Sequence, residues 1–121
     1  MGLDTSHGCW HGSYGAFMRW RMGLHALISD APGKSFKTLE DAWSHGDYDD
    51  QSVPINVLMM HSDCDGEIAA KDCGPLADAL QNLVDEKMPA RALYDEIRPA
   101  TERFIAGLRK AATAGEAVEF S

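Results

Sequence analysis

The chain has 121 residues, which is enough for one domain with a buried core and too short for two. Hydrophobic residues make up 45% of the sequence and charged residues 25%, a composition that excludes a disordered or low-complexity protein. The formal net charge of −8 argues against nucleic acid and anionic membranes as partners, because both are bound by clustered Lys and Arg. We therefore expect a single domain over residues 1–121, with a basic protein left open as a partner.

No stretch has the charge and hydropathy of a secretion signal, and none is apolar over the length of a membrane span. The sequence therefore predicts a cytosolic protein. Its three cysteines, Cys9, Cys64 and Cys73, are an odd number in a chain long enough to fold without cross-links. We expect reduced thiols, with a disulfide between Cys64 and Cys73 as the alternative.

The first elements expected are a short strand at residues 2–4 and a helix over residues 13–29. Ser13 is a suitable N-cap for this helix. Apolar side chains then recur at helical intervals, namely Phe17, Trp20, Leu24, Leu27 and Ile28. Arg19 and Arg21 are expected on the solvated face of the same helix.

The middle of the chain has a weaker pattern. Residues 34–52 are rich in acidic side chains and are expected to form a long loop. The apolar run at residues 55–60 is expected to be a short buried strand, with a helical turn as the alternative because periodicity does not separate the two over so few residues.

Two further helices are expected in the second half of the chain, over residues 75–87 and 89–114. Pro75 favours a helix start, because proline is well tolerated at a first helical position. Helical spacing continues across Pro99, which predicts either one kinked helix or two abutting helices. With a last short strand at residues 117–120, the fold class expected is α+β, mainly α, with about three amphipathic helices.

The stretch from His61 to Asp72 has the pattern of a cation-binding loop. Between Glu40 and Asp72, nine acidic residues accompany a single base, Lys71, so a cation meets a negative field there. A hard dication needs six or more oxygen ligands, which alternate residues supply if the chain turns tightly, as Gly66 permits. The predicted ligands are His61, Asp63, Asp65, Glu67 through its carbonyl, and Asp72.

These twelve residues resemble the calcium loop of EF-hand proteins, which has Gly at the sixth position. The resemblance implies one divalent cation, Ca²⁺, Mg²⁺, Mn²⁺ or Zn²⁺, as the cofactor. Three features depart from the family pattern: His61 replaces the first Asp ligand, Asp72 replaces a longer Glu, and Gly74-Pro75 delays the exit helix. The alternative is a turn without an ion, in which Asp63 or Asp65 accepts backbone N–H bonds.

The segment Val57-Leu-Met-Met-His61-Ser-Asp63-Cys-Asp65-Gly66 is also similar to the first motif of DHH-family phosphoesterases, where a buried strand ends in a manganese-binding turn. An imidazole suits manganese better than it suits calcium. The remaining ligands have to lie upstream, because no His follows the loop. The alternative function is therefore a metal-dependent hydrolase of a phosphoester or nucleotide, using His61, Asp63 and Asp65 with His7 or His11.

The N-terminal segment holds a second candidate pocket, which comprises Asp4, His7 and His11. With Cys9 between the two histidines, the segment has the ligand types of a zinc site, and His61 or Cys64 supplies a possible fourth ligand. The alternative is packing around Trp10, with the imidazoles bonded to carbonyls or carboxylates. If this segment meets residues 61–65 in space, the two form one polar pocket.

Three segments carry a further resemblance: Gly2-Leu-Asp-Thr-Ser-His7, Trp10-His11-Gly-Ser-Tyr-Gly-Ala-Phe17-Met-Arg-Trp20-Arg21 and His61-Ser-Asp-Cys-Asp-Gly-Glu-Ile68. Together they resemble a group of small bacteriophage and prophage proteins, over most of the chain. The resemblance implies a phage or prophage setting and the cytoplasm of a bacterial host, without implying an activity. The function expected is that of a small accessory protein that binds a host protein or a small ligand.

Overall fold

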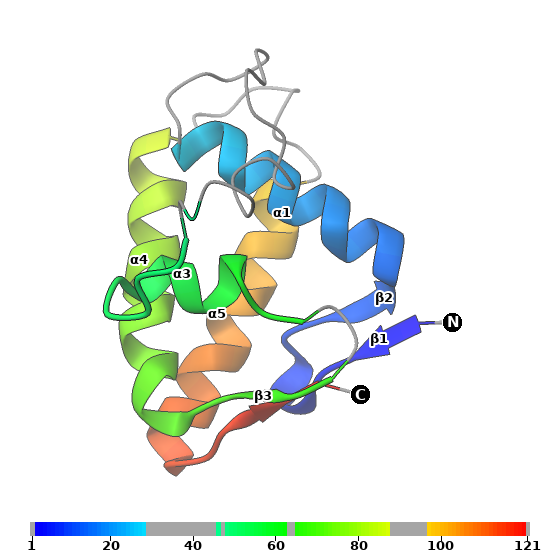
Figure 1. Ribbon diagram of the computed structural model, residues 1–121. Coiled ribbons are helices and arrows are strands. Elements are labelled where there is room, and N and C mark those ends of the chain that lie inside the picture. The colour runs from blue at the N-terminus through cyan, green and yellow to red at the C-terminus, as the bar shows by residue number, and fades with distance from the viewer. Residues whose placement is uncertain (1, 29–45, 47, 63–64, 88–96, 121) are drawn as a thin grey trace.

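The structure is a computed structural model that describes residues 2–28, 46, 48–62, 65–87 and 97–120. In chain order its elements are β1 (Gly2–Asp4), the 3₁₀ helix η1 (Ser6–Gly8), β2 (His11–Ser13), α1 (Tyr14–Ile28), α3 (Pro54–Met59), β3 (Glu67–Ile68), α4 (Ala70–Lys87), α5 (Ile97–Ala114) and β4 (Val118–Glu119). The long helices form the body of the molecule, and the short strands lie together near both chain termini (Figure 1). The predicted class, α+β and mainly α, is confirmed. None of these helices is both long and apolar enough to cross a membrane.

Helix α1 confirms the prediction made from apolar spacing. Ser13 caps it, because its Oγ accepts a hydrogen bond of 3.0 Å from the backbone N–H of Ala16. Some predictions lie outside the described residues: the helix end at residue 29, most of the acidic loop at 34–52, Asp63, Cys64 and the helical stretch 89–96.

Helix α4 begins at Ala70, so the predicted start at Pro75 is wrong. Pro75 lies inside the helix, where it removes one backbone hydrogen bond. Gly74 makes this position tolerable, because it has no Cβ to collide with the proline ring that follows. The exit from the loop is therefore helical from Ala70 and is not delayed by Gly74-Pro75.

Residues 54–59 form helix α3, which corrects the prediction of a strand at 55–60. Pro54 lies in the first helical turn, where its fixed φ favours a helix and its missing N–H breaks no helical bond. Near the other end, the carbonyl oxygen of Leu58 accepts a hydrogen bond from the buried side chain of Arg21. Contacts with the rest of the fold therefore select the helical alternative for this short run.

Helix α5 begins at Ile97 and places Pro99 in its first turn, where proline is tolerated. The described part of the predicted region 89–114 is therefore one helix. It packs side by side with α4 (Figure 1). The buried residues of α5 are Ala100, Thr101, Phe104, Ile105, Gly107, Leu108 and Ala111.

The short strands form two antiparallel pairs, β1 with β2 and β3 with β4. An isolated antiparallel bridge between Thr5 and Phe120 connects these pairs. The strands expected at residues 2–4 and near the end of the chain are thus present. The last strand pairs with a segment inside the loop 61–72, a partner that the sequence did not indicate.

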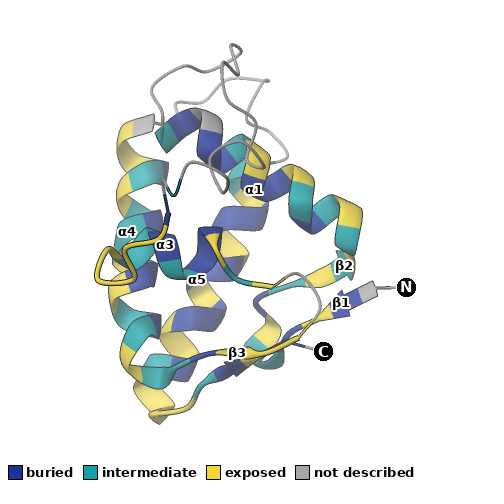
Figure 2. Cartoon of the chain, viewed as in Figure 1, coloured by how far each residue is buried: buried dark blue, intermediate teal, exposed yellow. Residues whose placement is uncertain are grey.

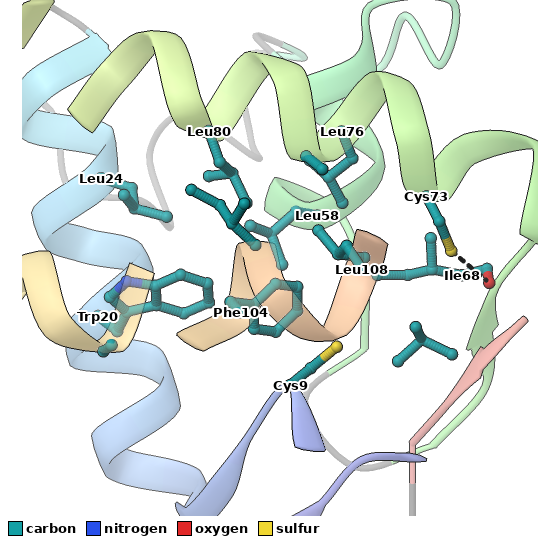
Figure 3. Packing of buried hydrophobic residues seen from close by; sticks show 14 of the residues in the cluster. Cys9, Trp20, Leu24, Leu58, Ile68, Cys73, Leu76, Leu80, Phe104 and Leu108 are labelled. Carbon is teal, nitrogen blue, oxygen red and sulfur yellow. Dashed lines mark hydrogen bonds between the residues drawn. The ribbon is translucent and has the colours of Figure 1, made fainter. Parts of the chain in front are cut away.

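The core lies between α1, α4 and α5, whose outward faces are exposed (Figure 2). Figure 3 shows Leu76 and Leu80 of α4 directed into the core, to which α5 contributes Phe104 and Leu108. A cluster of five aromatic rings extends the core toward the strands: Trp10, Phe17, Trp20, Phe104 and Phe120. This cluster joins the N-terminal segment, α1, α5 and the C-terminal segment.

Arg21 corrects the expectation of a solvated side chain, because only 1% of its surface is exposed. Its Nη1 donates hydrogen bonds to the carbonyl oxygens of Leu58, at 3.2 Å, and His61, at 2.6 Å. Its guanidinium carbon also lies 4.7 Å from the ring centroid of Phe17. Arg21 therefore fixes the end of α3 and the start of the following loop to α1. Arg19 is exposed, as expected.

Cys9 and Cys73 are buried free thiols, in agreement with the prediction for these two residues. In Figure 3, Cys9 points into the core, and Cys73 Sγ faces the carbonyl oxygen of Ile68. Burial raises the pKa of Cys9 from its ordinary value of 9.0 to about 12, with a smaller contribution from Cys73 and an opposing hydrogen bond from Thr5. Burial also raises the pKa of Cys73.

The raised pKa of Cys9 predicts a loss of stability at alkaline pH. The unfolded chain loses the thiol proton above pH 9.0 and the folded chain keeps it up to about pH 12, so this stabilising contribution is complete below pH 9.0 and lost as the pH rises toward 12. Urea unfolding at about pH 8 and about pH 10.5 measures the effect. Wild type should lose more free energy of unfolding between these values than Cys9→Ala, and equal losses would contradict the prediction.

Candidate functional site

Both ends of the chain meet the loop 61–72 at one edge of the molecule. Next to the bridge between Thr5 and Phe120, the backbone N–H of Phe120 donates a hydrogen bond of 2.8 Å to the carbonyl oxygen of Gly66. These segments border an open surface hollow of about 520 Å³, here called the acidic hollow, which is lined by Asp4, Thr5, Ser6, Gly66, Glu67, Glu119 and Phe120. The N-terminal segment therefore lines one hollow with Gly66 and Glu67, whereas the predicted pocket is with residues 61–65.

Three exposed carboxylates border the acidic hollow. Glu67 of β3 and Glu119 of β4 are register partners, so their side chains leave the strand pair on the same face. Asp4, the last residue of β1, lines the same hollow. Like charges directly opposite each other in neighbouring strands destabilise the pair. A cationic group bound between these side chains would remove that repulsion.

His61 lies inside the loop, and both of its ring nitrogens face backbone carbonyl oxygens. Its Nδ1 is 2.8 Å from the carbonyl oxygen of Ser62, and its Nε2 is 3.0 Å from the carbonyl oxygen of Glu67. A neutral imidazole has one N–H and donates to one of these oxygens at a time. The imidazole stacks on the ring of Phe120, with 4.0 Å between the centroids. Gly66 lies against the imidazole edge, because a Cβ at that residue would be 3.4 Å from His61 Cε1.

Two backbone features of the described part of the loop correspond to positions of the calcium-loop pattern, while residues 63 and 64 lie outside the described residues. Gly66, at the sixth position, has a left-handed φ of +89°, and α4 begins at the tenth position, inside the loop. A calcium ion would bind the carbonyl oxygen of Glu67 at the seventh position, which here faces His61 Nε2. The imidazole therefore makes the contact that a cation would make.

The other predicted metal ligands lie in different surroundings. Asp65 is exposed, and Asp72 is half-buried in the first turn of α4, where its backbone N–H donates to the carbonyl oxygen of Ala69. Asp63 lies outside the described residues. In the described part of the chain, no three His, Cys, Asp or Glu side chains are grouped to hold a metal ion.

Among the described residues, the histidines of the second candidate pocket make separate side-chain contacts, two by His7 and one by His11. His7 Nε2 lies 3.0 Å from Glu116 Oε1, and its Nδ1 lies 2.9 Å from Ser6 Oγ. His11 Nδ1 lies 3.5 Å from Asp4 Oδ1, across the pair formed by β1 and β2, and is largely exposed. The two histidines therefore have different partners.

Sequence reasoning missed the contribution of the C-terminal segment to this site. Glu116 contacts a residue 109 positions earlier in the chain, and the backbone N–H of Glu119 donates 2.9 Å to Ser6 Oγ, 113 positions earlier. The pattern at residues 117–120 indicates a strand but does not identify its partner. Pairing over such distances is set by the packing of α5, which positions β4 beside the loop.

Neither models of known protein families, nor curated proteins, nor solved structures match this chain. A fold by itself does not determine a function. Function is therefore inferred from the residues of the site.

Proposed function

We propose that the protein is a small accessory binding protein in a phage or prophage setting, whose acidic hollow accepts a basic side chain of a host protein. The observation that carries this proposal is the facing pair of Glu67 and Glu119, with Asp4 at the same hollow. Carboxylates bind the guanidinium of Arg through paired hydrogen bonds. The net charge of −8 also attracts basic partners over longer distances.

The size and framework of the acidic hollow suit this role. It has a volume of about 520 Å³ and is open to solvent, so a side chain on the surface of a partner can reach it. Its floor is held by the bridge between Thr5 and Phe120 and by the hydrogen bond from Phe120 to Gly66. Acceptors on a fixed backbone lose little conformational freedom when a ligand binds, so more of the interaction energy remains as affinity.

Binding of a fluorescein-labelled peptide that alternates Arg and Gly tests the proposal. Neutralising the acidic hollow is expected to weaken binding about tenfold or more, because each exposed ion pair contributes up to about 1 kcal/mol. The measurement is fluorescence anisotropy at low and high salt, and the variant is the triple substitution Asp4→Asn, Glu67→Gln and Glu119→Gln.

A matched control changes the net charge equally at exposed acids on α4 and α5. This control carries Asp85→Asn, Glu86→Gln and Glu102→Gln. It should bind the peptide nearly as well as wild type does. Equal losses in the two triple variants would show that net charge alone drives binding and would contradict the proposed site.

For the loop 61–72, we propose that His61 holds the wild-type loop closed and that a divalent cation enters only after the imidazole leaves the Glu67 carbonyl. The support is the pair of contacts from His61 to the carbonyl oxygens of Ser62 and Glu67. The substitution His61→Asp removes the imidazole and supplies the oxygen ligand expected at the first position. The variant should therefore bind calcium better than wild type does.

Thermal unfolding of chelator-treated protein measures this difference. With a millimolar dissociation constant, about 10 mM Ca²⁺ should stabilise His61→Asp by about 1.4 kcal/mol, or a few degrees in melting temperature. Wild type should change little with calcium, magnesium, manganese or zinc. An equal rise in wild type and variant would show that His61 does not compete with the ion.

The alternative considered from the sequence, a metal-dependent hydrolase, requires imidazole nitrogens directed at a shared ion. In the described structure, His61 faces two carbonyl oxygens and His7 faces Ser6 and Glu116. These contacts favour the binding protein over the hydrolase.

A further inference from the structure

Three side chains beside the acidic hollow form a chain of contacts that the binding function does not use. Ser6 Oγ lies 2.9 Å from His7 Nδ1, and His7 Nε2 lies 3.0 Å from Glu116 Oε1. A hydroxyl, an imidazole and a carboxylate in series are the parts of an activated nucleophile. Ser6 also lines the hollow, so its hydroxyl borders a space of about 520 Å³.

The surrounding hydrogen bonds assign the protons in this chain. Ser6 Oγ accepts a hydrogen bond of 2.9 Å from the backbone N–H of Glu119. Because the hydroxyl oxygen can accept two bonds, the assignment comes from the Glu116 carboxylate, which only accepts. The proton of a neutral His7 is therefore on Nε2, and Nδ1 accepts from the Ser6 hydroxyl. The other ring nitrogen, Nε2, carries the proton that the Glu116 carboxylate accepts. In this tautomer His7 is a base for Ser6, and Glu116 orients the ring.

The backbone of His7 has an uncommon conformation at this arrangement. Its φ of 63° and ψ of 10° lie in the left-handed region, where a residue other than Gly is uncommon. In the same residue the imidazole lies beside the hydroxyl of the preceding residue, Ser6. Backbone strain of this kind concentrates at functional sites.

We propose that Ser6 is a nucleophile for acyl transfer, with His7 as its general base and Glu116 as a positioning residue. Ser6 Oγ forms a bond to the carbonyl carbon of an ester, and its proton passes to His7 Nδ1. The ester C–O bond then breaks, and the leaving alcohol takes the proton from His7. Water next attacks the acyl group on Ser6, returns the proton through His7, and releases a carboxylic acid and free Ser6.

The substrate class follows from the acidic hollow, and this part rests on the proposed function. Three carboxylates border the hollow, so an ester that carries a cationic group is the expected substrate. An anionic ester should react more slowly, because the same carboxylates repel it. The nucleophilic reactivity of Ser6 does not depend on ligand charge. The nucleophile and the substrate preference are therefore tested separately.

The first test is labelling with an uncharged fluorophosphonate, located by peptide mass spectrometry. Ser6 should be labelled, and Ser52 is an internal control because its hydroxyl donates 2.6 Å to Asp50 and, among the residues that the structure describes, bonds to no imidazole. His7→Asn should lower the labelling rate about 100-fold, since a general base contributes that much or more. Asn tolerates left-handed φ, so the local backbone is kept.

The kinetics of Glu116→Gln separate a positioning role of Glu116 in catalysis from a purely structural role. It should lower kcat for a cationic nitrophenyl ester about tenfold and leave KM unchanged, because Gln does not stabilise an imidazolium as a carboxylate does. Thermal unfolding of each variant shows whether the fold is retained. Absence of label at Ser6, or equal labelling in folded His7→Asn, would overturn the nucleophile. Labelling with no preference for cationic esters would retain the nucleophile and overturn the choice of substrate.

Discussion

Replacing Arg21 with Met is expected to lower the free energy of unfolding by about 1–3 kcal/mol. Met keeps much of the side-chain volume but removes the donor to the carbonyl oxygens of Leu58 and His61. The Leu58 oxygen keeps a hydrogen bond of 3.1 Å from the backbone N–H of His61, so the loss falls mainly on the His61 oxygen. An unsatisfied buried acceptor costs about 1–3 kcal/mol. The same substitution should loosen the start of the loop 61–72, because Arg21 holds that point to α1.

Urea unfolding of Arg21→Met and of Arg19→Met measures this effect on one helix. Arg19 is exposed, so its replacement should change stability by less than about 0.5 kcal/mol. Similar values for the two variants would contradict the anchoring role of Arg21. Peptide binding by folded Arg21→Met should also weaken, because the loop contributes Glu67 to the acidic hollow.

Replacing Gly107 with Ala is expected to destabilise the fold by about 2–3 kcal/mol, although Ala normally favours a helix. A Cβ at Gly107 would lie 2.9 Å from both the Cα and the backbone N of Cys9, and closer still to its Sγ. Backbone atoms have no alternative rotamer, so α5 and the N-terminal segment would have to separate. The substitution therefore acts directly on the contact between α5 and the N-terminal segment, which carries part of the acidic hollow.

Gly15→Ala is the matched control, because Gly15 is an exposed helical glycine in α1. A Cβ there would meet only the flexible end of Arg19, at 3.4 Å, and Ser13 Oγ at 4.0 Å. Its stability should stay equal or rise by up to about 1 kcal/mol. Thermal or urea unfolding of both variants provides the comparison. A stable Gly107→Ala protein would show that the N-terminal segment does not pack on α5 as described.

The sequence predicts the long helices because their apolar residues repeat over several turns. It gives the class of fold for the same reason. Helix α3 is predicted only as an alternative, because six residues are too few to show a helical or strand period. The start of α4 is predicted too late, because Pro75 suggests a helix boundary although Gly74 lets the helix continue. Local pattern thus determines long elements, while short ones depend on tertiary contacts.

The candidate site is only partly visible in the sequence, because its contacts join distant segments. The sequence identifies His61 as a candidate because it lies among oxygen donors in one loop. Its contact with Phe120 is not predictable in this way, because it depends on the pairing of β3 with β4. Arg21 is expected at the surface from its charge, and its burial follows from carbonyl partners 37 and 40 positions later. Charge pattern alone does not reveal such partners.

The central claim is that the acidic hollow is the binding site for a basic group. An NMR titration of ¹⁵N-labelled protein with the Arg and Gly peptide tests it most directly. Amide shifts should concentrate at Thr5, Ser6, Gly66, Glu67 and Glu119, and they should be lost in the triple variant that neutralises the hollow. Shifts confined to α4 and α5, or none at about 1 mM peptide, would contradict the claim.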